Sequence, residues 1–594
     1  MIVRQNRNRY TLVISLCVLL LAACSGTSEP TLPATAAPVV ATATATMAAE
    51  QPSPTAVPVV PTDTAAPIAP PVEVLDVAAP PTLTATDLDL SLVADKVFLY
   101  PVPTLYAGDL VTFQFVTHVP PMINPADVMV HIFVNDKLIV QDRIGGRNLG
   151  GDSIGLYTWA WDTTGQPGQQ TVRILIDPED RLQIGDENPD NNEVVQIVDI
   201  QPAQALPRDE QGAEWVSQET TYTTVHVVSG TAAHRDLRQL TALTDEAFTA
   251  VIAKLGVTPQ RRYDVYFIDR VIGQGGYAGN SIVISYLDRN YAGGGLREVL
   301  VHEAAHILDQ QIAPRDVTFL REGLAVWVAG GHYKPENLDV RAAALLQIDA
   351  YVPLPQLIDQ FYPVQHEIGY LQAAALVNYL VNEYGWERVR DFYSHVSVEG
   401  YSSASAAIDA GMQAYFGKPL LQIEQDWLAF LSQQRVDADA VADLRVTIQF
   451  YNVMRTYQQK YDPTAHFLTA WLPSTLEMRQ RGIIADVTRH PHDEMNIVLE
   501  TMLYAADTAL RTGDYNQARV LVDSVARVLE TGSIIDPLAT SYLDIVRQAT
   551  NVGFVVHQIE MTGNQATAYV TSIYRDYLTP INFARTQRAW VMLN

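Results

Sequence analysis

The chain has 594 residues, of which 48% are hydrophobic and 18% charged, which is ordinary for a globular protein of several domains. Its formal net charge of −27 argues against a nucleic-acid partner, because phosphate binding needs basic patches. Only two cysteines occur, Cys17 and Cys24, so disulfides are not expected to stabilise the folded part.

The N-terminus has the features of a targeting segment. Arginines at positions 4, 7 and 9 precede the apolar stretch 11–21, which is too short to be a membrane-spanning helix. This stretch runs into Leu21-Ala22-Ala23-Cys24, which resembles the lipobox of bacterial lipoproteins. The resemblance implies a signal peptide at 1–23, a lipid on the Cys24 thiol, and an extracytoplasmic protein anchored to a bacterial cell membrane. The alternative is an ordinary secretory signal with an incidental cysteine.

Residues 24–90 are rich in proline, threonine and alanine and show no hydrophobic periodicity. Such a segment cannot bury enough apolar surface to fold, and its prolines favour extended conformations. We therefore predict a disordered tether that holds the folded part away from a membrane or cell wall.

Residues 91–202 alternate between apolar and polar positions in short runs separated by turn residues, which predicts an all-β sandwich. The clearest runs are 111–116, 128–134, 172–176 and 194–198. The acidic and asparagine-rich segment 185–193 before the last run resembles Ig-like modules of the CARDB type. The resemblance implies a module that could bind a cell-surface or wall ligand. The segment could bind calcium, and a solvated turn is the alternative.

Residues 215–435 are predicted to contain strands and helices, becoming mostly helical. We expect strands at 220–228, 263–268 and 281–286, and helices at 233–255, 319–329, 366–384, 387–395 and 420–432.

The stretch 301–310 contains H-E-x-x-H, with His302 and His306 four residues apart. On a helix the two imidazoles lie on one face, one turn apart, where they can bind one zinc ion. Glu303 lies beside them and can take a proton from a water molecule. A catalytic zinc usually has three protein ligands, so a third is required.

Glu322 is the candidate third ligand, because it lies in the predicted helix 319–329 within Glu322-Gly323-Leu324-Ala325. An H-E-x-x-H helix followed by a helix with E-G-L-A resembles the gluzincin zinc metallopeptidases of the peptidase MA-like families. The resemblance implies one Zn²⁺ held by His302, His306 and Glu322, with Glu303 as the general base for peptide hydrolysis.

The same resemblance implies two further parts of the site. The segment that begins at His366 resembles the family's helix with an oxyanion-stabilising residue, for which Tyr370 is the first candidate and His366 the second. An edge strand that binds the substrate backbone is expected at Tyr277, Ala278 and Gly279.

One position departs from the family pattern. Val326 stands where these enzymes often have an acidic residue that orients a zinc-bound histidine, and loss of such support typically weakens metal affinity or activity. Asp309 is a possible substitute. His332, just past the second helix, is expected to be solvated rather than a ligand.

Residues 436–594 are predicted to form a mostly helical domain of unknown role with a small β hairpin or sheet. We expect helices at 440–459, 495–511, 515–530 and 537–550, and strands at 552–560, 566–574 and 588–593. His490 and His492 could bind a metal, but a solvated loop is the favoured interpretation.

The prediction is therefore a multidomain protein: an Ig-like sandwich, an α+β gluzincin-like domain and a mostly α C-terminal domain. The predicted function is a membrane-anchored extracytoplasmic zinc metallopeptidase that acts on a peptide or protein substrate. The alternative is an extracellular binding or adhesion lipoprotein whose peptidase-like domain is a weakly active or inactive scaffold. Hydrolysis of a non-peptide amide or ester is a third possibility.

Overall fold

The computed structural model describes residues 88–182, 185–269, 275–313, 317–572, 575–587 and 589–593. The predicted signal peptide, the lipidation site Cys24 and nearly all of the predicted tether lie outside these residues. Within the described residues, no helix combines the length and the apolar character that crossing a bilayer requires.

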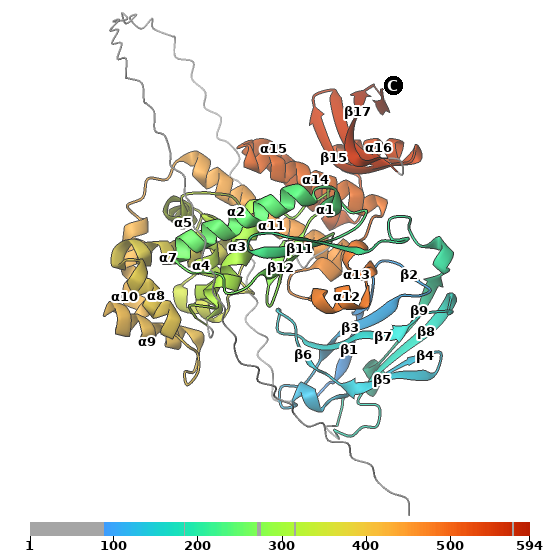
Figure 1. The fold of residues 1–594 in the computed structure, drawn as a ribbon, viewed down its shortest axis with the longest axis horizontal. Helices are drawn as coiled ribbons and strands as arrows, with labels where there is room; N and C mark the ends of the chain where they lie inside the picture. The colour runs from blue at the N-terminus through green and yellow to red at the C-terminus, as the bar shows by residue number, and fades with distance from the viewer. Residues whose placement is uncertain are drawn as a thin grey trace, which may run out of the picture. The chain divides into compact units, whose positions relative to one another are not determined.

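The N-terminal region is β-rich, as predicted, and consists of two sheets (Figure 1). The first has the order β1 (Ser91–Tyr100), β3 (Leu110–His118), β7 (Ser153–Asp162), β6 (Gly146–Arg147). The second has the order β2 (Leu105–Tyr106), β9 (Glu193–Gln201), β8 (Gly168–Ile176), β4 (Met129–Val134), β5 (Lys137–Arg143). Their alternating apolar residues share one core, in which Phe113 and Phe115 of β3 meet Ile132 of β4 and Ile174 of β8.

A five-stranded sheet follows. Its order is β10 (Trp215–Glu219), β11 (Thr223–Val228), β12 (Tyr263–Ile268), β14 (Ile282–Ser285), β13 (Gly276–Ala278). The three central strands are parallel, and the outer strands β10 and β13 run antiparallel to their neighbours. The single helix predicted at 233–255 is instead two, α1 (Ala232–Arg235) and α2 (Leu237–Leu255). The chain leaves the helix at Asp236, whose carboxylate accepts hydrogen bonds from Arg235 and Tyr286.

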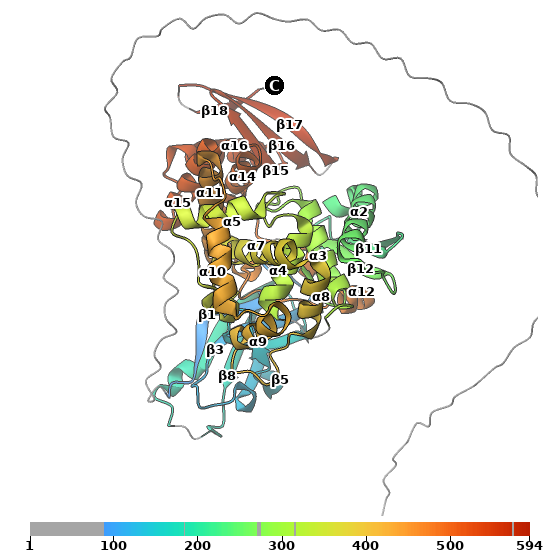
Figure 2. The same cartoon turned by 90° about the vertical axis from the view of Figure 1, so that its left-hand side faces the viewer.

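The helices that follow include α3 (Leu296–Asp309), α4 (Thr318–Ala329) and α7 (His366–Tyr384), which has the predicted bounds. The others are α5 (Leu338–Gln347), α6 (Leu354–Asp359), α8 (Trp386–His395), α9 (Ala404–Phe416) and α10 (Leu420–Leu431). Helices α4 and α7 lie side by side (Figure 2). They pack closely because Gly323 leaves no side chain between them. A Cβ at Gly323 would lie 2.8 Å from the carbonyl carbon and oxygen of Ala373.

The C-terminal region is helical with a small sheet, as predicted. It contains α11 (Ala438–Tyr461), α12 (Thr475–Arg481), α13 (Ala485–Thr488), α14 (Glu494–Arg511), α15 (Tyr515–Thr531) and α16 (Pro537–Asn551). The sheet has the order β15 (Phe554–Thr562), β16 (Gln565–Ser572), β17 (Arg575–Arg585), β18 (Trp590–Met592). The predicted hairpin is confirmed, but the strand that follows it is β17, which the sequence prediction missed. Pro580 within this run hides the strand pattern, because proline cannot donate a ladder hydrogen bond.

Aromatic packing and ionic contacts are among the interactions that join the β-rich region to the C-terminal region. Trp471 packs against Tyr100 and Trp159, with ring centroids 5.1 and 5.9 Å away. The buried guanidinium of Arg489 donates to the carboxylates of Asp109 and Glu210, with shortest distances of 2.6 and 2.8 Å. An aromatic cluster and the buried Arg489–Asp109 ion pair therefore hold the two regions together, and Glu210 adds the segment that follows the β-rich region.

Candidate metal centre

Helix α3 places His302 and His306 on the same side. Its apolar residues Leu300, Val301, Ala304 and Leu308 are buried in the main core, which fixes the rotation of the helix. The two imidazoles face α4, and their Nε2 atoms lie 3.0 Å apart.

Glu322 of α4 completes a triangle of donor atoms. Its Oε2 lies 3.2 Å from Nε2 of His302 and 3.2 Å from Nε2 of His306. Zinc bonds of about 2.0–2.1 Å in tetrahedral geometry place neighbouring ligand atoms about 3.3 Å apart, so this donor set fits one such ion. Among the described residues, this is the one group of three such side chains found close enough to hold a metal.

Electrostatics also prepare these side chains for a cation. Burial lowers the pKa of His302 to about 4, which leaves this imidazole neutral. Burial alone would raise the pKa of the Glu322 carboxyl. The effect of the two nearby imidazoles is larger than that of burial and holds this pKa well below its usual range. Burial opposes protonation of His306, but the Glu322 carboxylate raises its pKa to about 9, so metal binding must release this proton.

Glu303 is buried beside the triangle, and its Oε2 has no hydrogen-bond partner in the described part of the chain. Burial raises the pKa of this carboxyl to about 7, close to the value that suits a general base at neutral pH. An unpaired buried carboxylate costs stability, so its retention beside three metal-binding groups points to chemistry rather than to folding.

Glu303 and His302 open onto a cavity of about 110 Å³. The region 215–435 and α11 both contribute to it, since its wall includes Tyr370, His366 and, from the C-terminal region, Tyr451. Both predicted oxyanion candidates, Tyr370 and His366, therefore line the same cavity as the candidate base. The Tyr370 ring lies 6.1 Å from the His302 ring and 4.5 Å from the His366 ring.

The prediction for His332 is wrong. It was expected to be solvated, but its side chain is only 10% exposed, lines the cavity and lies 4.7 Å from the Tyr370 ring. Its Nδ1 lies 2.7 Å from Oε2 of Glu367. The reason is a tight turn at Gly331, where a Cβ would lie 1.9 Å from the Lys334 carbonyl oxygen, so the chain folds back towards α7.

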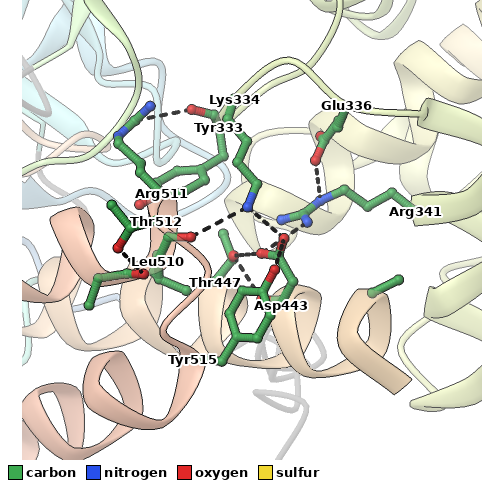
Figure 3. A network of polar contacts seen from close by, with 12 residues as sticks. Tyr333, Lys334, Glu336, Arg341, Asp443, Thr447, Leu510, Arg511, Thr512 and Tyr515 are labelled. Carbon is green, nitrogen blue, oxygen red and sulfur yellow. Dashed lines mark hydrogen bonds and ion pairs between the residues drawn. The ribbon is translucent and has the colours of Figure 1, made fainter. Parts of the chain in front are cut away.

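A buried network supports this turn (Figure 3). Arg341 contacts the carboxylates of Glu336, Glu367 and Asp443 at 2.8, 3.0 and 3.3 Å. Lys334 reaches Asp443 of α11 at 2.6 Å. Because Glu367 also binds His332, the network connects the cavity wall to the C-terminal helices.

The sequence interpretation missed Tyr362, which touches a predicted metal ligand. Its hydroxyl donates to Oε1 of Glu322 at 3.0 Å, leaving Oε2 directed at the two histidines. Such a contact orients a ligating carboxylate. Tyr362 follows α6 in a turn without any motif, so no local signal identified it.

The histidines lack the support that the family pattern provides. Val326 is buried in the main core, and Nδ1 of His306 is buried without a hydrogen-bond partner among the described residues. Asp309 accepts a hydrogen bond from the Tyr393 hydroxyl at 2.7 Å and makes none with His306. The suggestion that Asp309 orients His306 is therefore wrong.

None of the three residues predicted to bind the substrate backbone lines the cavity. Tyr277 and Ala278 lie in β13, at the edge of the five-stranded sheet, and Gly279 follows the strand. The Tyr277 hydroxyl donates to the Pro473 carbonyl at 2.9 Å, so its side chain points to the C-terminal region. The residues of this stretch that line the cavity come just before, at 275–276.

No family model matches the chain, and no curated protein matches it. Among solved structures, an M1 zinc metallopeptidase from Deinococcus radiodurans aligns with 57% of this chain and 92% of its own, at 12% identity and a TM-score of 0.26. A metallopeptidase from Bacteroides thetaiotaomicron aligns with 85% of each chain at 9% identity and a TM-score of 0.20. A CARDB domain from Pyrococcus furiosus aligns with 19% of this chain and 94% of its own, at 15% identity and a TM-score of 0.15.

Proposed function

We propose that this protein is a zinc metallopeptidase. The observation that carries the proposal is the triangle of His302, His306 and Glu322 donor atoms, 3.0–3.2 Å apart, with the unpaired carboxylate of Glu303 beside it. This arrangement serves hydrolysis better than passive binding, because a scaffold gains nothing from a buried, unpaired carboxylate.

His302, His306 and Glu322 would hold the ion, and Tyr362 keeps Glu322 in position. When bound, zinc supplies Lewis-acid chemistry that polarises a carbonyl and makes water a stronger nucleophile. Glu303 takes a proton from the attacking water and delivers it to the leaving amine. Tyr370 or His366, which both line the cavity, donates a hydrogen bond to the oxygen that becomes negatively charged.

The proposed location is the outer side of a bacterial cell membrane. It is supported by the lipobox-like segment that ends in Cys24 and by the proline-rich sequence after it. The proposed partners are a peptide or protein substrate, the membrane through the lipid on Cys24, and a surface or wall ligand of the Ig-like module.

The test combines metal analysis with digestion of a mixed peptide library by the mature chain, with and without a chelator. We expect about one zinc per chain, loss of zinc in His306→Ala, and chelator-sensitive cleavage. Glu303→Gln should keep zinc and lose cleavage by at least about 1000-fold, whereas Glu383→Gln, at an exposed position of α7, should match the wild type. Undiminished turnover in Glu303→Gln would rule out the assigned base, and wild-type protein with zinc but no cleavage would favour the scaffold alternative.

A further inference from the structure

Arg455 of α11 lines the same cavity as His302 and Glu303. Among the described residues that line the cavity, Arg455 is the one lysine or arginine. Burial lowers the pKa of its guanidinium to about 10, so this side chain remains positively charged at neutral pH. The cavity therefore combines a metal centre with a fixed positive charge.

The buried arginines of the described residues are all paired, whereas Arg455 is half-buried. Arg289 contacts Glu500 at 2.5 Å, and Arg341 and Arg489 each contact more than one carboxylate. Arg455 makes no ion pair with any carboxylate of the described residues. Its NH1 donates a hydrogen bond to Oε1 of Gln458 at 2.9 Å. A partly desolvated charge without a counter-ion costs stability, which favours a ligand that supplies one at the cavity.

The surroundings of Arg455 suit a planar anion. Its guanidinium carbon lies 5.0 Å from the centre of the Phe467 ring. Contact with the ring occupies one face of the guanidinium, while the N–H groups point outward in its plane, where a carboxylate can accept two hydrogen bonds at once.

The position of the cavity bears on which carboxylate can reach it. An unmodified peptide carries a free carboxylate at its C-terminal end, and the cavity joins Arg455 to His302 and Glu303. The rings of Phe467, His366 and Tyr370 form a continuous series of contacts from Arg455 to His302. A carboxylate at Arg455 therefore lies within a few residues of a bond held at the metal centre, since an extended residue spans about 3.5 Å.

We propose that Arg455 binds the free C-terminal carboxylate of short peptides, so that the site cleaves close to the C-terminus and disfavours internal bonds of long chains. This inference rests on the proposed peptidase function. In it Arg455 is a specificity-determining residue, and the substrate class is short peptides with a free carboxyl end.

The test compares N-acetylated tripeptides that differ only in a free or amidated C-terminus. We expect the wild type to favour the free acid by about 10–100-fold in kcat/KM, as for a buried charge-assisted hydrogen bond. Arg455→Gln should abolish this preference by slowing hydrolysis of the acid and not of the amide, and Arg455→Lys should retain part of it. Arg445→Gln, at an exposed position of the same helix, is the matched control and should behave like the wild type.

Equal rates for acid and amide in the wild type, or an equal loss for both in a folded Arg455→Gln, would overturn the inference. A binding measurement separates this failure from failure of the peptidase proposal. Calorimetry with Glu303→Gln and the same peptides should show tighter binding of the acid, lost when Arg455→Gln is added. Selective binding without turnover in the wild type would refute the peptidase and keep the carboxylate site, whereas unselective binding would refute the carboxylate site.

Discussion

Replacing Gly323 with alanine is expected to weaken both the fold and the metal centre. The added Cβ would lie 2.8 Å from the Ala373 carbonyl, whereas ordinary contact begins at 3.4 Å, so α4 and α7 must separate by about 0.6 Å. Overpacking of this kind costs about 1–3 kcal/mol, and the better helix propensity of alanine returns up to about 1 kcal/mol. We therefore expect the free energy of unfolding to fall by about 1–2 kcal/mol.

The same change should reach the metal ligand next to it. As α4 moves away, the Glu322 carboxylate leaves its position 3.2 Å from His302 and His306, and zinc affinity should fall about tenfold. Urea unfolding of the metal-free protein measures the first effect, and competition with a zinc-binding dye measures the second.

The matched control is Gly369→Ala in α7. A Cβ there meets its nearest atom at 3.6 Å, which is ordinary contact, so this variant should be as stable as the wild type or slightly more so. If Gly323→Ala and Gly369→Ala unfold at the same urea concentration, the close packing of α4 and α7 does not require a glycine at position 323.

Three further predictions concern the site and the contact between regions. Tyr362→Phe removes the hydrogen bond to Glu322 and should weaken zinc binding about 10-fold without lowering the unfolding temperature of the metal-free protein. Tyr370→Phe should lower kcat by about 100-fold or more with little change in KM, and a larger loss in His366→Gln would reverse the order of the two oxyanion candidates. Asp486 of α13 accepts a hydrogen bond from Nε1 of Trp159 in the β-rich region at 3.1 Å. Burial raises the pKa of Asp486 to about 7, above its unfolded value near 3.8. Its contribution to stability is therefore complete below pH 3.8 and is lost as the pH rises through 7. The wild type should therefore lose stability relative to Asp486→Asn over that range, by up to roughly 1.4 kcal/mol per pH unit, and parallel unfolding curves for the two proteins would contradict this.

The sequence predicted the parts of the site that lie within one or two helices. Spacing of four residues places His302 and His306 on one face of α3, and the short E-G-L-A segment identifies Glu322. These are local relations along the chain, and the structure brings the three side chains together.

Residues that reach the site from distant segments were missed. Tyr362 and Arg455 belong to no motif, and their positions depend on how α6, α7 and α11 pack, which periodicity does not specify. His332 was misjudged for a related reason, because the residue after a helix is usually exposed and only the turn at Gly331 returns it to the core. The strand β17 was missed because of Pro580, which lies opposite Tyr569 of β16 and outside the positions 583–585 that pair with β18.

The ion pairs of Arg489 bear on how this protein can change over evolutionary time. Arg489 has its acceptors in two other parts of the chain, Asp109 in the β-rich region and Glu210 in the segment that follows it. Exchanging the β-rich region for another module would leave this guanidinium without Asp109 and would uncover Trp471. Recombination at the boundary near residue 202 would therefore yield an unstable hybrid unless the C-terminal helices changed as well, so these two distant segments are expected to be inherited as one unit.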